Sequence, residues 1–168
     1  MIEQIIKTRE YLNYIEEHYN NVQKAWEIIK EKCKDMFFMA DDYRYFSIQE
    51  AVETHDFSKL SPQEFLPYRK KFYPTKWEEE NDNTIEREFN SAWEHHKKNN
   101  PHHFENWKEI KGYPAIEVHV VHNMIDLIAM SMKFGGTAES FYEKNKTEFD
   151  FPQWADEFVH EIFESIKQ

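Results

Sequence analysis

The sequence predicts an all-α fold, a helical bundle of roughly six or seven helices in one domain spanning residues 1–168. Only three glycines occur, and two of them are the adjacent pair Gly135-Gly136, which leaves little material for tight β-hairpins. Apolar residues near the start of the chain recur at alternating spacings of four and three, as on one face of a helix. No segment shows the strict alternation of a strand. A chain of 168 residues can bury a core as one domain.

The first third of the chain is expected to hold two helical regions. Residues 1 to about 37 form one long helix or two abutting ones, with His18 at the border of its apolar stripe. Ser47 is expected to cap the next helix because Glu50 follows three residues later, and this helix runs to His55-Asp56. The stripe, which we interpret as core packing, comprises Leu12, Ile15, Tyr19, Val22, Trp26, Ile29 and Cys33.

The remaining helices are marked by their capping and stop signals. Ser61-Pro62 followed by Glu64 starts a further helical turn. The polar residues 74–83 are expected to form a loop. Further helices are predicted over Thr84 to about Lys98, ending at Asn99-Asn100-Pro101, over Pro114 to Lys133, closed by Gly135-Gly136, and near 137–146 and 152–167.

Composition excludes several classes of partner. The net charge of −11 repels a phosphate backbone, so no extended nucleic acid is expected as a partner. Cys33 is the only cysteine, which excludes an internal disulfide and a thiolate metal cluster. No apolar run approaches the roughly 20 residues that span a bilayer, so no membrane is expected. The start of the chain lacks the layout of a signal peptide, and we expect a cytoplasmic protein.

Histidines and aspartates suggest metal chemistry. Neutral imidazole and carboxylate ligands suit one or two divalent ions such as Fe, Mn, Zn, Ni or Co. Asp126 shares one helical face with His119 and His122 and lies in apolar company, where a carboxylate is costly without a cation or hydrogen bonds. The candidate metal ligands are His18, His55, Asp56, His96, His102, His103 and Asp126.

The order of these residues along the chain resembles the HD superfamily of metal-dependent phosphohydrolases. In that superfamily, helices bring a histidine, an HD pair and a distant aspartate to a metal. HDFSK, which begins at His55, is similar to the HD-x-G-K form of many members, with Ser58 in place of glycine. NPHHFENW resembles the double-histidine motif of the branch that binds two metals. The resemblance implies an HD-like, all-α metal-binding domain.

A closer resemblance is to an uncharacterised bacterial and phage family of similar length. Its pattern HDxSKfsxxEfxpY matches His55 to Tyr68, and AWxxHxxxNPHHxxxW matches Ala92 to Trp107. An aspartate in a late helix, here Asp126, completes the pattern. The match covers roughly residues 15–135 and departs at Leu127, where tryptophan is expected.

The resemblance implies a hydrolase that acts on a small phosphorylated substrate, a nucleotide or related phosphoester, by metal-activated water. Asp56 would bridge two metals, and Lys59 would neutralise phosphate oxygens in the transition state. The unligated member of the pair His102 and His103 would assist the leaving oxygen, and we assign this role to His103. The first metal would be completed by His18, His55 and Asp126, and the second by His96 with His102 or His103.

Other interpretations stay open from the sequence. The same ligands loaded with two irons would serve an oxygenase that cleaves C–C or C–P bonds. A non-catalytic interaction protein, which could be phage-encoded, would keep the metal as a structural clip. Lys59 could be a surface charge. His119 and His122 are expected to pack in the core or contact the ligands, with His122 the better placed, whereas His95 is expected to point outward and His160 to lie at the periphery.

Overall fold

The computed structural model describes residues 1–106 and 115–167, and over these residues the chain is all-α, as predicted. Nine α-helices and two short 3-10 helices form, and the described residues include no strand. The chain divides into two compact units. Unit 1 comprises Met1–Tyr19 and Asp56–Asn100, and unit 2 comprises Asn20–His55 and the chain from Pro101 onward. The expectation of a single domain over residues 1–168 stays a prediction.

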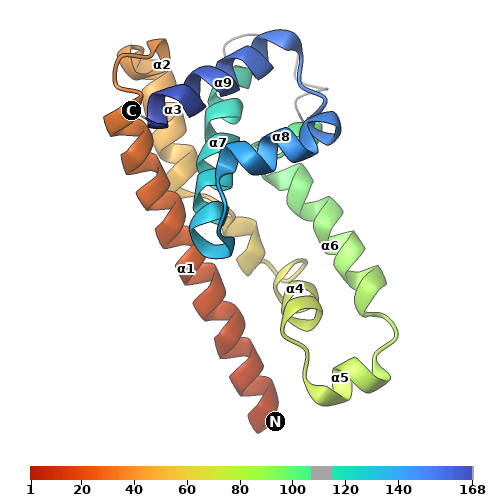
Figure 1. Cartoon of the computed structure of the whole chain (residues 1–168). Coiled ribbons are helices and arrows are strands. Elements are labelled where there is room, and N and C mark those ends of the chain that lie inside the picture. The colour runs from red at the N-terminus through yellow and green to blue at the C-terminus, as the bar shows by residue number, and fades with distance from the viewer. Residues whose placement is uncertain (107–114, 168) are drawn as a thin grey trace. The chain divides into compact units, whose positions relative to one another are not determined.

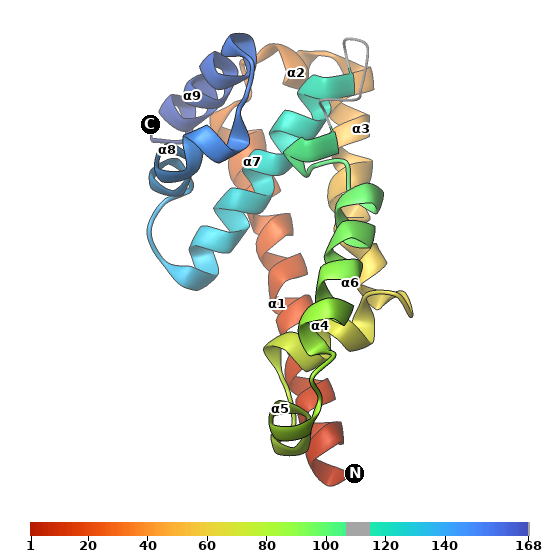
Figure 2. The same cartoon turned by 90° about the vertical axis from the view of Figure 1, so that its right-hand side faces the viewer.

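Unit 1 holds the first part of helix α1 (Ile2–Lys32), whose residues pass into unit 2 after Tyr19. Helix α4 (Phe65–Phe72) packs against α6 (Ile85–Asn99), as Figure 2 shows, and both contact the 3-10 helix η1 (Phe57–Leu60). A small aromatic core of Tyr11, Tyr68 and Ala92 is buried among these helices. Unit 1 also holds α5 (Lys76–Asn81).

Helix α5 occupies residues that were predicted to form a loop, and that prediction is wrong. Thr75 and Glu78 form a reciprocal capping box, in which each side chain accepts a hydrogen bond from the other residue's backbone N–H, at 3.2 and 2.8 Å. The T-x-x-E signature of this cap is legible in the sequence. Glu78 is also held by a buried bidentate ion pair with Arg69 of α4, so α5 is tied to the rest of unit 1.

Only part of the apolar stripe of α1 lies in the core. Its residues from Val22 to Cys33 are buried and belong to the core of unit 2, as predicted. Leu12 and Tyr19 were also expected in the core, but they are 44% and 38% exposed. In the first half of α1 the buried face lies instead on Tyr11 and His18, one position before Leu12 and Tyr19. A difference of one residue rotates the buried face by about 100° around the helix.

Unit 2 is built around α7 (Ala115–Phe134), which packs against α3, α8 and α9 (Figure 1). This helix is buried on several faces, which explains its long apolar sequence. It ends at Gly135 and Gly136, whose φ angles of 81° and 79° are the left-handed values expected of a glycine stop. The other elements of unit 2 are α2 (Phe37–Ala40), α3 (Asp42–Glu53), η2 (Phe104–Asn106), α8 (Ala138–Phe149) and α9 (Gln153–Lys167).

One predicted helix start is wrong, and another lies outside the described residues. Helix α3 is capped by Asp41, whose side chain accepts from the backbone N–H of Arg44 at 2.8 Å, so the prediction of Ser47 as the cap is wrong. Ser47 lies inside α3, because aspartate is at least as good a cap and comes first in the chain. The predicted start of α7 at Pro114 lies outside the described residues.

Across the described helices, none has the length and apolar character needed to cross a membrane.

Replacing Arg69 with leucine should lower the free energy of unfolding by about 3–5 kcal/mol at neutral pH, because Glu78 would remain as a buried charge without its partner. Hydrogen bonds from Arg69 lower the pKa of Glu78 from 4.5 to about 2. A depressed carboxyl pKa means that the pair contributes fully above about pH 5 and loses its contribution as the pH falls toward 2. The deficit of Arg69→Leu in denaturant unfolding should therefore shrink over this window.

Arg87→Leu supplies the control, since Arg87 is exposed in the same unit and should change stability by no more than about 0.5 kcal/mol. A deficit of equal size at neutral pH and near the folded pKa of Glu78 would contradict the assignment.

Candidate metal centre

Asp56 is the centre of the candidate ligand set in unit 1. It is 6% exposed and has a φ of 56°, a left-handed conformation that aspartate tolerates better than most residues. Its backbone carbonyl accepts from the N–H of Lys59 at 2.8 Å, which starts η1. This turn also brings the Lys59 ammonium onto the Asp56 carboxylate, where it donates to Oδ2. Lys59 is 8% exposed, so it is a buried charge and not a surface one.

The two carboxylate oxygens of Asp56 face different histidines. His18 of α1 places its Nε2 3.4 Å from Oδ2, and His96 of α6 places its Nε2 3.2 Å from Oδ1. Both histidines are buried. A buried carboxylate with a histidine nitrogen near each of its oxygens could serve as a ligand of a divalent metal ion.

His96 is oriented from behind by Glu64, a residue that the sequence interpretation used only as a helix-capping signal. The Glu64 carboxylate is fully buried and lies 2.8 Å from His96 Nδ1 and 2.6 Å from His95 Nδ1. A carboxylate at Nδ1 holds the proton there, which leaves Nε2 as the nitrogen that can bind a metal. His95 was expected to point outward, but its ring is half-buried and held by Glu64.

Ser58, two residues after Asp56, takes part in the same network. Its hydroxyl donates to Glu64 at 3.0 Å and accepts from Asn100 Nδ2 at 2.7 Å. Glycine at this position could make neither bond. Ser58 fixes the carboxylate that orients His96.

The pKa directions in this network follow from its hydrogen bonds. Burial alone would raise the pKa of the Glu64 carboxyl, but hydrogen bonds from His96 and His95 lower it overall. Burial likewise opposes a charge on His96, yet hydrogen bonds to Asp56 and Glu64 raise the pKa of that imidazole. Glu64 is therefore ionised at neutral pH and accepts from both histidines.

Unit 2 carries a second ligand set. His55, two residues after the end of α3, places Nε2 3.7 Å from Asp126 Oδ1, and His102 places Nε2 3.9 Å from Asp126 Oδ2. The rings of His55 and His102 stack at 4.6 Å between centroids. His103 lies against His102 at 4.4 Å and is half-buried, whereas His102 is 1% exposed. The dipeptide His55-Asp56 thus contributes one residue to each unit.

His122, one turn before Asp126 on α7, lies behind His55. Its Nε2 is 2.9 Å from His55 Nδ1, and both rings are buried. A proton on His55 Nδ1 that is donated to His122 leaves His55 Nε2 as the nitrogen on the Asp126 side. His122 therefore orients the His55 ring as Glu64 orients the His96 ring. This contact with a candidate ligand agrees with the expectation from the sequence.

The distances from the histidine nitrogens to their neighbours separate candidate metal ligands from groups that orient a histidine ring. Metal bonds of about 2.0–2.2 Å place two donors on one tetrahedral or octahedral ion about 3.0–3.5 Å apart. The pairs of His18 and His96 with Asp56 lie in that range, and the pairs in unit 2 exceed it by a few tenths of an ångström. The distances of 2.8 Å to Glu64 and 2.9 Å to His122 are those of hydrogen bonds. In unit 2, His55, His102 and His122 also offer nitrogens within 4.8 Å of one another. These buried groups could hold a metal ion.

Other predicted features fall outside the two ligand sets. His119 is half-buried on α7, and burial lowers the pKa of its imidazole. His160 is peripheral, as expected, with its side chain 38% exposed beside Glu143. Trp107, which closes the AW–H–NPHH–W pattern, lies outside the described residues.

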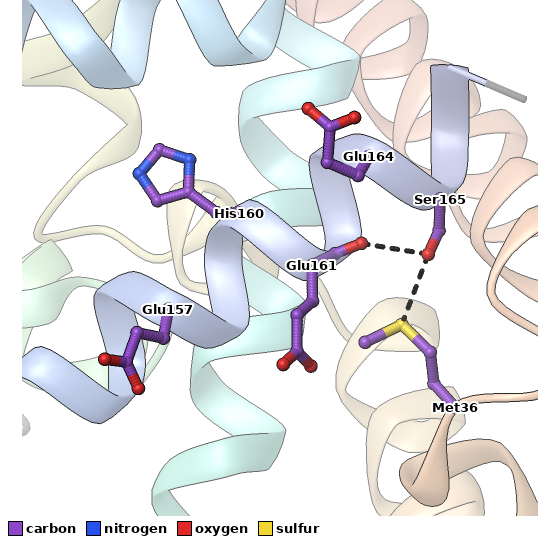
Figure 3. A pocket seen from close by; sticks show the side chains of 6 residues that line it. All are labelled: Met36, Glu157, His160, Glu161, Glu164 and Ser165. Carbon is purple, nitrogen blue, oxygen red and sulfur yellow. Dashed lines mark hydrogen bonds between the residues drawn. The ribbon is translucent and has the colours of Figure 1, made fainter.

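A cavity of about 570 Å³ in unit 2 contains none of the predicted ligands. Figure 3 shows that its glutamates point in different directions from α9 and do not converge on a point. Its hydrogen bonds run from Ser165 Oγ to Met36 Sδ and to the carbonyl of Glu161, at 4.0 and 2.9 Å. The lining residues are Met36, Glu157, His160, Glu161, Glu164 and Ser165.

Comparison with known families matches residues 7–168 to a family model described as "Family of unknown function (DUF5662)". The chain belongs to this family. The DUF5662 match includes every candidate ligand from His18 to Asp126. Searches of curated proteins and of solved structures returned no match.

Replacing His122 with phenylalanine should weaken metal binding by this DUF5662 protein about 10- to 100-fold, the usual effect of removing the partner that orients a ligating histidine. The readout is competition with a chromophoric chelator for Zn²⁺ or Co²⁺, and the free energy of unfolding is measured in parallel. His119→Phe is the matched control, with the same change one turn earlier on α7. Equal affinities for the two variants would contradict the role of His122.

Proposed function

We propose that the protein is a metal-dependent phosphohydrolase that acts on a nucleotide or related phosphoester. The observation that carries the proposal is the surrounding of Asp56, where a buried carboxylate lies between two histidine Nε2 atoms and a buried ammonium. Nitrogen and carboxylate ligands bind a divalent metal, and a lysine next to them neutralises an anionic substrate. The order of the candidate ligands along the chain, which resembles the HD superfamily, supports the same reaction class.

Asp56, His18 and His96 would hold the metal in unit 1, with Asp56 bridging where two ions are bound. A bound divalent ion would supply Lewis acidity and lower the pKa of a coordinated water toward neutrality. Iron, manganese, zinc, nickel and cobalt all accept this donor set. Glu64 and Ser58 contribute by holding the His96 ring in place.

Lys59 has the position for charge neutralisation at phosphorus. Its ammonium donates to Asp56 and lies 5.9 Å from the ring centres of Tyr14 and Tyr68, which shield it from solvent. A low-dielectric setting strengthens the attraction between an ammonium and phosphate oxygens. Such a lysine stabilises the transition state most where negative charge accumulates.

The second ligand set belongs to the same proposal. His55, His102 and Asp126 would act as metal ligands, and His103 would protonate the leaving oxygen. His122 keeps the His55 ring oriented. The assignment of these residues to particular metals stays a prediction.

The two alternative functions make different demands on the same residues. A di-iron oxygenase that cleaves a C–P bond would use the same ligands and could use Lys59 to bind its anionic phosphonate substrate. A metal-clipped interaction protein would need the ligands for stability alone. Iron content with oxygen consumption identifies the first alternative, and metal-dependent stability without any turnover identifies the second.

Purified protein should contain a stoichiometric divalent metal by elemental analysis and should hydrolyse at least one member of a panel of nucleotides and phosphoesters. Asp56→Ala should lose both the metal and the activity. Metal-replete wild-type protein that hydrolyses nothing in the panel would contradict the proposed function.

Replacing Lys59 with methionine should lower kcat about 100-fold or more while the metal content stays unchanged, because Lys59 acts on charge that develops in the transition state. Lys98→Met is the control, since Lys98 is exposed at the end of α6 in the same unit. An unchanged kcat for Lys59→Met would contradict the role of Lys59 in neutralising charge in the transition state.

A further inference from the structure

Two tyrosine hydroxyls of unit 1 are buried without a hydrogen-bond partner in the part of the chain that the structure describes. They belong to Tyr11 and Tyr68, which are 0% and 5% exposed. Tyr142 in unit 2 shows the ordinary arrangement, because its buried hydroxyl donates to Asp156 at 2.7 Å. Buried hydroxyls are usually bonded, since each one without a partner has lost its hydrogen bonds to water.

Both tyrosines lie in the shell around the Asp56 ligand set. The Tyr68 ring is 5.7 Å from the His96 ring and 5.9 Å from the Lys59 ammonium. The Tyr11 ring stacks on Tyr14 at 6.4 Å, and Tyr14 in turn lies parallel to His18 at 6.2 Å. The part of the unit 1 core that holds the two tyrosine rings therefore adjoins the proposed metal ligands.

The electrostatics keep these hydroxyls protonated. Burial raises the pKa of both phenols, and the negative charges of Asp56 and Glu64 raise them further. A protonated phenol can donate a hydrogen bond, and the Lys59 ammonium, 5.9 Å from the Tyr68 ring, is a donor only. The cluster thus offers donors next to the metal ligands, which suits a ligand that supplies acceptors.

We propose that the hydroxyls of Tyr11 and Tyr68 bind phosphoryl oxygens of the substrate beside Lys59. This inference rests on the proposed function and adds the residues that recognise the phosphate. Phosphoryl oxygens are anionic acceptors that can receive hydrogen bonds from two phenols and an ammonium. A neutral sugar hydroxyl or base edge carries no negative charge to pair with the Lys59 ammonium. The site therefore selects for the phosphate of the substrate and not for the group attached to it.

The test measures inorganic phosphate binding to the metal-loaded protein by calorimetry, together with the melting temperature. Tyr68→Phe and Tyr11→Phe should each weaken phosphate binding about 10-fold, the effect of losing one hydrogen bond to a charged group. Neither change should lower the melting temperature, because each removes a hydroxyl that has no partner in the unliganded protein. Tyr142→Phe should do the reverse, with a lower melting temperature and an unchanged phosphate affinity.

Each contrary result has a definite meaning. No phosphate binding by the wild type, or unchanged affinity in both unit 1 variants, overturns the inference. A melting temperature lowered as much as in Tyr142→Phe, with phosphate affinity unchanged, assigns the hydroxyls to an internal water and also overturns it. Phosphate binding that depends on Tyr11 and Tyr68 without any phosphoester hydrolysis would leave the subsite standing and remove the proposed function. Phosphoester hydrolysis with an unaltered KM in both variants would support the proposed function and contradict the role of the two hydroxyls.

Discussion

The contact between the Asp56 carboxylate and the Lys59 ammonium is the interaction on which the candidate centre of unit 1 depends. It forms because Asp56 adopts a left-handed conformation and starts a 3-10 turn that returns Lys59 to its own side chain. Burying two charges is costly unless they are paired and their remaining hydrogen-bonding capacity is used. His18 and His96 lie at the two oxygens of the same carboxylate. The local backbone thus brings together the opposite charges of Asp56 and Lys59, and tertiary packing adds the nitrogens of the two histidines.

The two ligand sets share a principle but differ in chemistry. In each unit a histidine has an orienting group at Nδ1 and directs Nε2 toward an aspartate: Glu64 orients His96, and His122 orients His55. A carboxylate can only accept from the ring, so it fixes the tautomer, whereas an imidazole can either donate or accept. The tautomer of His96 is therefore more firmly determined than that of His55. Rigidity of this kind matters because a ligand held in advance loses less entropy when the metal binds.

Sequence reasoning predicted the fold class and the helices around α6, α7 and α9 because their periodicity and stop signals are local. It misplaced the cap of α3 and missed α5, although Asp41 and the Thr75–Glu78 box are both visible as motifs. It also selected the residues that meet at Asp56. It could not find Glu64 as the partner of His96, because 32 positions separate them and only tertiary packing brings them together. The buried state of Lys59 and the isolated hydroxyls of Tyr11 and Tyr68 are likewise properties of packing.

The central claim is that the Asp56 carboxylate is a metal ligand with His18 and His96 at its two oxygens. Anomalous diffraction from crystals of the metal-loaded protein, recorded on both sides of the metal absorption edge, tests it most directly. The account predicts a peak about 2.0–2.2 Å from an Asp56 oxygen and from Nε2 of His18 or His96. A peak bonded to His122 or Glu64 but not to Asp56, or fully loaded crystals with no peak near Asp56, would contradict it.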